Sequence, residues 1–341
     1  MTSNDTPLDR YDALLLDLDG TVYRGGTAVD GAEPAIRAAH QAGVAVRFVT
    51  NNASRTPEDV ADHLNRLGIP AKHDEVSTSA QAAAGLLVDR VSPGAKVLIL
   101  GTEALATEAR IRGFTPVRTA GDDVVAVLQG LSQDLGWRDL AEACVAIRAG
   151  ALWVACNVDA TLPTERGLLP GNGALVAAVA AATDAHPLIA GKPARPLMDD
   201  AIRATAATHP LAIGDRLDTD IAGATNAGID ALLVLTGVST PADLLAAPPD
   251  QRPRYVAADL HSVRTPATDL EIAPRPDWQV DMMDSHPHLR HTGSNPEPDP
   301  LPALRSLCTA WWATQAGRTT VTPQDEHATA ALTALGMPTS H

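Results

Sequence analysis

The chain has 341 residues, of which 45% are hydrophobic, and its 41 acidic and 26 basic residues give a net charge of −15. This charge argues against a nucleic acid or an anionic membrane held by a basic surface, and the length predicts two or three structural units. The N-terminus is polar and no apolar run reaches membrane-spanning length, so we expect no secretory signal and no membrane insertion. Three widely spaced cysteines, Cys144, Cys156 and Cys308, are typical of reduced thiols in the cytoplasm, with a catalytic cysteine as the weaker alternative.

Apolar runs of strand length alternate with alanine-rich helical stretches up to about residue 265, as in a parallel α/β sheet. The predicted strands are 13–17, 44–49, 96–100, 124–128, 152–156, 211–214, 231–235 and 255–257. The predicted helices are 33–42, 57–67, 78–90, 138–149, 171–183, 195–208 and 218–228. Thr56 before Pro57 is typical of a helix N-terminus, and Gly43, Gly68 and Gly228 stand where helices are expected to end.

The composition changes after residue 265. Ten of the 26 prolines and three of the five tryptophans lie in this last part of the chain. We therefore predict a linker at about 262–275 and a separate small domain after it.

Two carboxylates stand at the end of the first predicted strand. The stretch LLLDLDGTVY places Asp17 and Asp19 just before Gly20, which ends the apolar run. The carboxyl end of a strand is where open α/β sheets bind ligands, and paired acids are costly there unless a cation neutralises them. The sequence thus indicates a metal site, with solvated acids at a strand end as the alternative.

Three further strand ends carry polar residues. They are Thr50, Asn51 and Asn52 after 44–49, Lys192 within LIAGKP, and Asp215 with Asp220 within GDRLDTD. Each has an ordinary explanation as a helix cap, a solvated loop lysine or a turn. Because the carboxyl ends of parallel strands lie along one edge of a sheet, we expect the four sets to converge.

The order DLDGT, TN, GKP and GDxxxxD resembles the four motifs of the haloacid dehalogenase superfamily of phosphotransferases. Most of the chain between Thr50 and Lys192 is extra to those motifs, and this is where the phosphoglycolate and p-nitrophenyl phosphatase branch inserts its larger cap. The resemblance implies a Rossmann-like parallel-sheet core at 1–84 and 188–265 and an inserted α/β cap at 85–187. It also implies a small C-terminal α+β domain of acetyltransferase-like fold at 276–341.

For the aspartates, the resemblance implies phosphoryl transfer with Mg²⁺. Asp17 would attack phosphorus and form an aspartyl-phosphate, while Asp19, absent from dehalogenases, would protonate the leaving alkoxide and then deprotonate water. The ligands of Mg²⁺ would be the carboxylates of Asp17 and Asp215 and the backbone carbonyl of Asp19, with Asp220 outside this set, orienting a metal-bound water or Lys192. A cation is required because like charges about 4 Å apart repel by roughly 4 kcal/mol at an effective dielectric of about 20.

For the second and third motifs, the resemblance implies binding of the phosphoryl group. Thr50 and the backbone N–H of Asn51 would contact phosphoryl oxygens, and Asn52 is a further candidate substrate-binding residue. Lys192 would take part in catalysis by neutralising charge on the phosphate and the nucleophile.

The same branch implies hydrolysis of a small phosphate monoester, first of all glycerol 3-phosphate, with phosphoglycolate or another small metabolite as the alternative. Leu162 precedes Pro163 where vitamin B6 phosphatases carry histidine, which weakens a pyridoxal phosphate assignment. Four cap residues are expected either to contact the substrate or to be solvated: Asp159, Thr161, Glu165 and Arg166. Residues 21–31 are predicted to form a mobile hairpin beside the site.

The tail leaves other possibilities open. QAGR at 315–318 lacks the paired glycines of a coenzyme A loop, so a structural role or a homodimer contact through Trp311 and Trp312 is favoured. Three histidines, His286, His288 and His291, either bind zinc or lie in a solvated loop, which the proline-rich setting favours. The rival to an enzyme is a metabolite-binding scaffold on a retained phosphatase fold, which the intact acids and lysine disfavour.

Overall fold

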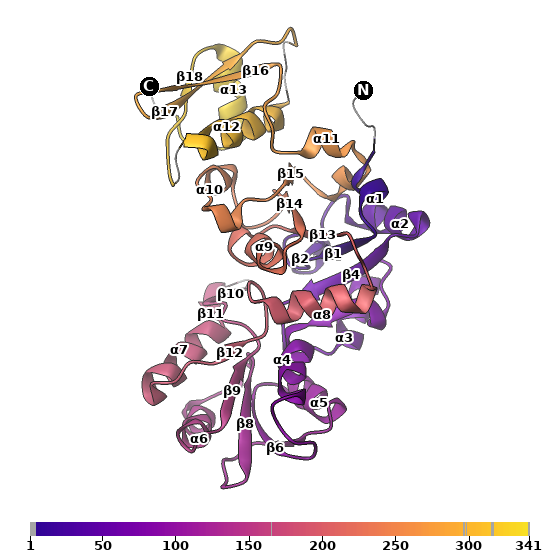
Figure 1. The fold of residues 1–341 in the computed structure, drawn as a ribbon, viewed down its shortest axis with the longest axis vertical. Helices are drawn as coiled ribbons and strands as arrows, with labels where there is room; N and C mark the ends of the chain where they lie inside the picture. Colours follow the sequence, from indigo (N-terminus) through magenta and orange to yellow (C-terminus); the bar gives the residue numbers. More distant parts are fainter. Residues whose placement is uncertain (1–4, 165, 296, 298, 315–316, 340–341) are drawn as a thin grey trace. The chain divides into compact units, whose positions relative to one another are not determined.

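The computed structural model describes residues 5–164, 166–295, 297, 299–314 and 317–339. The chain forms two compact units (Figure 1). Unit 1 consists of Met1–Val46, Leu67–Ile69 and Ala207–His341, and unit 2 of Arg47–Arg66 and Pro70–Ala206. Each unit contains parallel strands and helices, which confirms the predicted α/β class. None of the helices in the described ranges has the length and apolar character needed to cross a membrane.

Unit 1 is built around buried parallel strands in the order β15, β14, β13, β1. These strands are Tyr255–Ala257, Asp230–Val234, Pro210–Gly214 and Ala13–Leu16. Every residue of β1 and β13 is buried, as expected for strands covered on both faces. Leu16 of β1 pairs with Ile213 of β13, so the residues that follow these strands leave the sheet side by side.

Short helices surround this sheet. They are α1 (Pro7–Arg10), α2 (Ala32–Ala42), α9 (Ala222–Ala227), α10 (Pro241–Leu245) and α11 (Ala267–Leu270). Gly43 and Gly228 end α2 and α9 in the left-handed conformation, which confirms these two predicted helix ends. The predicted hairpin after β1 is present as β2 (Tyr23–Arg24) and β3 (Thr27–Ala28).

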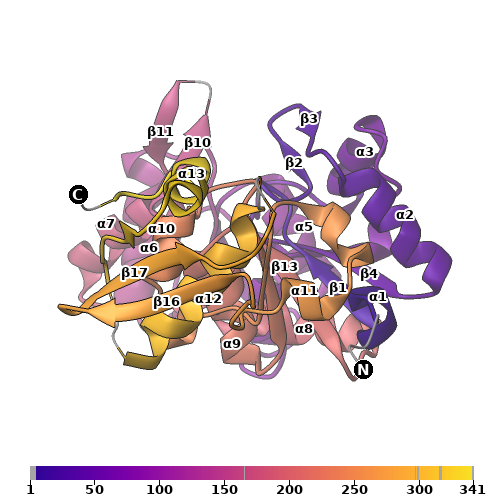
Figure 2. The ribbon, with the colours of Figure 1, turned by 90° about the horizontal axis from the view of Figure 1, so that it is seen from above.

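The C-terminal part of unit 1 is a small α+β arrangement, as predicted (Figure 2). Its strands are β16 (Trp278–Met283), β17 (His286–His291) and β18 (Thr322–Pro323), and its helices are α12 (Pro300–Thr314) and α13 (Glu326–Ala334). Helix α12 packs on the preceding elements. Arg305 donates a hydrogen bond to the Val256 carbonyl at 2.8 Å, and the Trp312 indole donates one to the Leu245 carbonyl at 3.0 Å.

Strand β4 (Ala45–Thr50) enters unit 2 and pairs in parallel with β5 (Val76–Thr78). The helices that pack against β5 are α3 (Pro57–Arg66), α4 (Ser79–Val88) and, from much later in the chain, α8 (Arg195–Thr205). The Thr56 hydroxyl accepts a hydrogen bond from the Asp59 N–H, which confirms the predicted N-terminus of α3.

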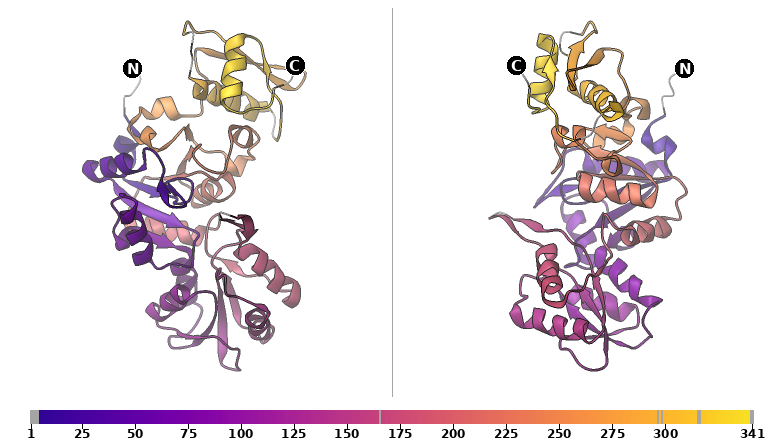
Figure 3. Two further views of the ribbon diagram at one scale, coloured as in Figure 1. Left: turned by 180° about the vertical axis from the view of Figure 1, so that it is seen from behind. Right: turned by 60° about the vertical axis from the view of Figure 1, so that its left-hand side comes forward.

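The rest of unit 2 is a second parallel sheet in the order β12, β9, β8, β6, β7. These strands are Leu188–Ile189, Leu152–Ala155, Val124–Gln129, Lys96–Leu100 and Thr115–Val117. Helices α6 (Trp137–Arg148) and α7 (Asn172–Thr183) lie on one face, and α4 and α5 (Glu103–Ile111) on the other (Figures 1 and 3). An exposed hairpin, β10 (Thr161–Thr164) and β11 (Gly167–Pro170), precedes α7.

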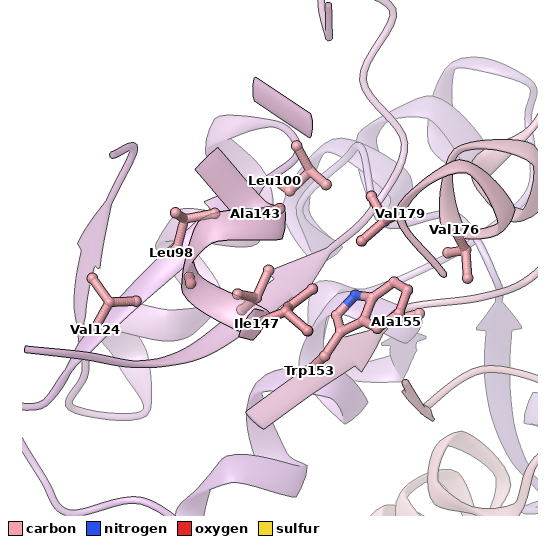
Figure 4. Close-up of a cluster of buried hydrophobic side chains, with 11 residues drawn as sticks. Leu98, Leu100, Val124, Ala143, Ile147, Trp153, Ala155, Val176 and Val179 are labelled. Carbon is pink, nitrogen blue, oxygen red and sulfur yellow. The ribbon is translucent and has the colours of Figure 1, made fainter. Parts of the chain in front are cut away.

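The apolar core of this second sheet lies between the strands and α6 and α7. Trp153 from β9 packs with Ile147 of α6 and Val176 of α7 (Figure 4). The buried Trp153 indole donates a hydrogen bond to the Gln129 side chain at 3.1 Å, so its one polar atom is satisfied. The second sheet thus has a core of its own, built from residues between Leu98 and Val179.

Candidate active site

Three aspartates meet in unit 1 at the ends of β1 and β13. Asp17 follows β1 and its N–H donates to the Ile213 carbonyl at 2.9 Å, which continues the strand pairing by one residue. Asp215 follows β13, and Asp220 lies in a single π-helical turn, Leu217–Ile221, where the sequence predicted the start of an α-helix. One carboxylate oxygen from each of the three lies within 4.8 Å of the others.

The chemistry of this group suits a divalent cation. Asp215 is fully buried and Asp220 is only 4% exposed. Adjacent buried carboxylates repel one another, and a hard cation with oxygen ligands removes that cost. In the described part of the chain, this is the only group of three histidine, cysteine or acidic side chains arranged to hold a metal ion. The geometry includes Asp220, to which the sequence assigned an indirect role.

The Asp215 carboxylate is held from several sides. Its Oδ2 accepts from the Val238 N–H at 2.7 Å, and its Oδ1 accepts from the Thr21 hydroxyl at 3.4 Å. A Cβ atom at Gly20 or at Gly237 would overlap this carboxylate, so both positions require glycine for space. Gly20 also has φ +91°, a conformation that other residues rarely adopt. The tight loops around Asp215 therefore hold its carboxylate in one orientation.

Asp19 differs from the other acids because its side chain is exposed. The Tyr23 hydroxyl donates a hydrogen bond to Asp19 Oδ2 at 3.4 Å. Tyr23 belongs to β2 and is 7% exposed. An exposed carboxyl group two residues from Asp17 has the access to solvent that a proton carrier needs.

In unit 2, Asn51 joins the end of β4 to the loop that carries Lys192. Asn51 Oδ1 accepts from the Lys192 N–H at 2.8 Å, and Asn51 Nδ2 donates to the Lys192 carbonyl at 3.0 Å. Lys192 is 3% exposed, and its ammonium group donates to the Val49 carbonyl at 2.9 Å. A Cβ at Gly191 would lie 2.5 Å from Asn51 Oδ1, which explains the glycine before the lysine.

Two residues that no sequence pattern indicated hold the backbone at Asn51 in place. The Asn51 carbonyl accepts from the Ser79 hydroxyl at 2.5 Å and from Asn157 Nδ2 at 2.7 Å. These two bonds satisfy the Asn51 carbonyl within the fold. Ser79 and Asn157 lie 28 and 106 residues from Asn51 in sequence, so only the fold reveals them.

The other predicted binding residues differ in their hydrogen bonds and in their place in the fold. Thr50 is 4% exposed, and its hydroxyl accepts from the Asn52 N–H at 3.1 Å. Asn52 Oδ1 accepts hydrogen bonds from the N–H and the hydroxyl of Ser54, so the Asn52 side chain stabilises the turn after β4. Asp159 accepts from Asn51 Nδ2 at 3.3 Å. Thr161 and Arg166 lie in the hairpin of β10 and β11, and Glu165 lies outside the described residues.

The cysteines do not form a site. Cys156 and Cys308 are fully buried, and burial raises the pKa of both thiols, so they stay protonated at neutral pH. All three cysteines are free of disulfides. Buried, protonated thiols disfavour the catalytic-cysteine alternative.

The histidines of the tail make other contacts. His286 is bonded to Thr319 and His288 to Gln324, and His291 packs against the Trp278 ring at 4.8 Å between centroids. The histidines do not form a metal-binding group of three within the described ranges. This disfavours the zinc alternative. The expected solvated loop is also wrong, because all three histidines lie in strand β17.

Trp311 and Trp312, the two tryptophans considered for a dimer contact, both make hydrogen bonds within the chain. Trp311 is buried and donates to the Gly317 carbonyl, and Trp312 donates to the Leu245 carbonyl. The supposed coenzyme A loop includes Gln315 and Ala316, which lie outside the described residues.

Comparison with known protein families finds matches in three regions of the chain. Residues 14–115 match the haloacid dehalogenase-like hydrolases, and residues 189–263 match a second hydrolase model of the same kind. Residues 275–337 match the GCN5-related N-acetyltransferase like domain, which confirms the predicted nature of the tail.

Individual relatives agree with this. The chain is 47% identical over 331 residues to the D-glycerol 3-phosphate phosphatase of Mycobacterium tuberculosis, covering 94% of this chain and 93% of the relative. The crystal structure of glycerol phosphate phosphatase from the same organism, in complex with magnesium, superposes with a TM-score of 0.93 at 46% identity over 98% of this chain and 100% of that one. A double mutant of thermostable NPPase from Geobacillus stearothermophilus matches 74% of this chain and 97% of its own at 37% identity and a TM-score of 0.68. The chain therefore belongs to the haloacid dehalogenase-like hydrolases.

Proposed function

We propose that this protein is a Mg²⁺-dependent phosphatase that hydrolyses small phosphate monoesters, with glycerol 3-phosphate as its main substrate. The observation that carries the proposal is the group of Asp17, Asp215 and Asp220 at the ends of two parallel strands. The 47% identity to a D-glycerol 3-phosphate phosphatase supports the choice of substrate. Phosphoglycolate and other small esters are the alternatives that a substrate panel separates.

The metal would be held by Asp17, Asp215 and the Asp19 carbonyl, with Asp220 as a direct or water-bridged partner. Carboxylates that lie this close and are this buried match the hard oxygen ligands of Mg²⁺. A bound Mg²⁺ would stabilise the negative charge that develops on the phosphoryl oxygens.

The aspartates then divide the chemistry. An Asp17 oxygen forms a bond to phosphorus as the bond from phosphorus to the leaving oxygen breaks, and Asp19 gives its proton to that oxygen. Asp19, now a carboxylate, takes a proton from the water that attacks the aspartyl-phosphate. Phosphate leaves, and Asp17 and protonated Asp19 are restored.

We further propose that Thr50, the Asn51 N–H and Lys192 bind the phosphoryl group. Support comes from unit 2, where the Asn51 side chain is bonded to both backbone groups of Lys192 and thereby fixes the two residues together. Lys192 would neutralise charge on the phosphate. Asn52 keeps its place as a candidate, although its side chain already bonds to Ser54.

The domain assignment remains a proposal with the same bounds: a core at 1–84 and 188–265, a cap at 85–187 and a C-terminal domain at 276–341. The family matches at 14–115, 189–263 and 275–337 support a core interrupted by an insertion and followed by a separate tail. The homodimer stays a prediction, which light scattering of the purified protein tests.

The function is tested by phosphate release from a panel of small esters in the presence of Mg²⁺ or of EDTA. We expect release from glycerol 3-phosphate with Mg²⁺ and its loss with EDTA, restored by added Mg²⁺. Release from another ester but not from glycerol 3-phosphate would make that ester the substrate. No metal-dependent release from any ester would favour the binding-scaffold alternative.

The nucleophile is tested by Asp17→Asn. We expect turnover to vanish while the far-UV spectrum and melting temperature remain near those of the wild type, because the amide has nearly the same shape but does not attack phosphorus. Asp122→Asn, which alters an exposed aspartate, is the matched control and should keep full activity. Normal turnover by Asp17→Asn would overturn the assignment.

A further inference from the structure

Tyr23 makes a contact that the proposed chemistry does not yet use. Its hydroxyl donates to Oδ2 of Asp19 at 3.4 Å, and the ring is 7% exposed. The Asp19 side chain itself is exposed. An exposed aspartate samples several rotamers, and a bond from a buried phenol restricts it to one of them.

The backbone holds Tyr23 over Asp19. The N–H groups of Val22 and Tyr23 both donate to the Leu18 carbonyl, at 2.8 and 3.1 Å, and the Gly20 N–H donates to the Tyr23 carbonyl at 2.8 Å. The chain therefore closes a tight loop between Leu18 and Tyr23. This loop brings the backbone of Tyr23 back beside that of Asp19, close enough for the phenol to reach the Asp19 carboxyl group.

We propose that Tyr23 is a positioning residue that holds the Asp19 carboxyl group in the rotamer needed for proton transfer. This rests on the proposed function, because it deepens the role of Asp19. The phenol donates to Oδ2, so the proton that Asp19 transfers is carried on Oδ1. Oδ1–H gives its proton to the leaving alkoxide as that oxygen separates from phosphorus, and Oδ1 later accepts a proton from the attacking water. Tyr23 keeps its own proton throughout.

The leaving group distinguishes this role from a purely structural one. Glycerol 3-phosphate releases an alkoxide that must be protonated, whereas p-nitrophenyl phosphate releases a stable phenolate that needs no proton. We expect Tyr23→Phe to lower kcat for glycerol 3-phosphate by about tenfold, a part of the 10²–10⁴ that general acid catalysis supplies, with little change in KM. The first-turnover burst of p-nitrophenolate, measured by stopped flow, should change less than about twofold.

Tyr11→Phe is the matched control. Tyr11 is a second buried tyrosine in unit 1, and its hydroxyl donates to the Asp230 carboxylate at 2.7 Å and lies 2.9 Å from the Tyr255 hydroxyl, from which it can accept. This variant loses the same atom and a similar bond from a place outside the proposed site. We expect it to react with both esters at the wild-type rate, and its melting temperature shows what loss of a buried phenol does to folding alone.

A double-mutant cycle tests whether Tyr23 acts through Asp19. In an Asp19→Asn background, Tyr23→Phe should change the residual rate less than about twofold, because the group it positions is no longer an acid. Additive losses in the cycle would show that Tyr23 acts independently, and would overturn the proposal.

The results separate the two proposals. If the wild-type protein hydrolyses neither ester, the proposed function fails and the role of Tyr23 falls with it. If the wild type hydrolyses both and Tyr23→Phe lowers both first-turnover rates equally, or lowers neither, the function stands and only the positioning role is wrong.

Discussion

Asp215 shows how one carboxylate is fixed by the residues around it. The Val238 N–H and the Thr21 hydroxyl bind its oxygens, and Gly20 and Gly237 leave the space that it occupies. The motif around Asp17 and Asp19 indicated where the acids are, but Val238 and Gly237 carry no signal that sequence reasoning uses. Their importance follows from loops that approach one another only in the folded chain.

The space at Gly237 yields a prediction at this scale. Gly237→Ala places a Cβ where the Asp215 carboxylate lies, so the carboxylate must rotate away from its ligand direction. We expect Mg²⁺ to bind about 10- to 100-fold more weakly, which is the usual cost of disturbing groups that orient metal ligands. Isothermal titration of the variant with Mg²⁺ measures this.

Gly26→Ala is the control for Gly237→Ala, because a Cβ at Gly26 meets no atom within 4 Å. This variant should bind Mg²⁺ as the wild type does. Wild-type affinity in Gly237→Ala would mean that Asp215 is not a ligand.

At the scale of the elements, periodicity predicted most of the long segments. The strands expected at 96–100 and 255–257 have those bounds in the structure, and the helix expected at 57–67 ends one residue earlier. The elements that were missed include α5 at Glu103–Ile111 and the β10 and β11 hairpin. Helix α5 follows Thr102 at its N-terminus and is followed by Gly113 in the left-handed conformation, so the sequence did carry boundary signals for it. Every residue of β11 is exposed, so this strand has no buried alternation to detect.

Helix α5 also buries a charge, which gives a stability prediction. Glu108 is 4% exposed, and burial raises the pKa of its carboxyl group, with the Glu58 charge adding to the rise and Arg112 opposing it. The folded chain thus keeps this proton at pH values where the unfolded chain has lost it. Stability is therefore highest below pH 4.5 for this group and falls as the pH rises through the raised pKa.

Glu108→Gln removes the cost of this buried charge. We expect its melting temperature at neutral pH to exceed that of the wild type by a few degrees, and the difference to shrink toward pH 4.5. Glu58→Gln removes only the neighbouring charge and should give a smaller increase. Differential scanning calorimetry over this pH range measures these melting temperatures. A Glu108→Gln variant that melts below the wild type at neutral pH would contradict the prediction.

At the scale of the whole molecule, the sequence predicted a core, an insertion and a tail after a linker, but not the contacts that the tail makes. The structure packs α12 of the tail on α10 and β15 within unit 1. Arg252 lies over the Trp312 ring at 5.0 Å, and Arg305 is 5% exposed. These contacts join residues about 50 to 70 positions apart, a range that local patterns do not report.

The packing of α12 predicts a loss of stability in Trp312→Phe. The variant loses the hydrogen bond to the Leu245 carbonyl and part of the stacking with Arg252. We expect the free energy of unfolding to fall by about 1 to 2 kcal/mol in urea titrations. Trp137→Phe changes an indole that is 80% exposed, so its effect should stay within about 0.5 kcal/mol. Equal effects of the two variants would show that α12 does not stabilise unit 1.

The hydrogen bonds of α12 bear on which sequence changes this attachment tolerates. Arg305 and Trp312 donate to the main-chain carbonyls of Val256 and Leu245, and Arg252 donates back to the Trp312 carbonyl. Every residue supplies a carbonyl, so changes of side chain at Val256 and Leu245 that keep the backbone path leave the acceptors in place. Arg252 is different, because its side chain both donates to Trp312 and stacks on the ring, so the attachment depends on that residue itself.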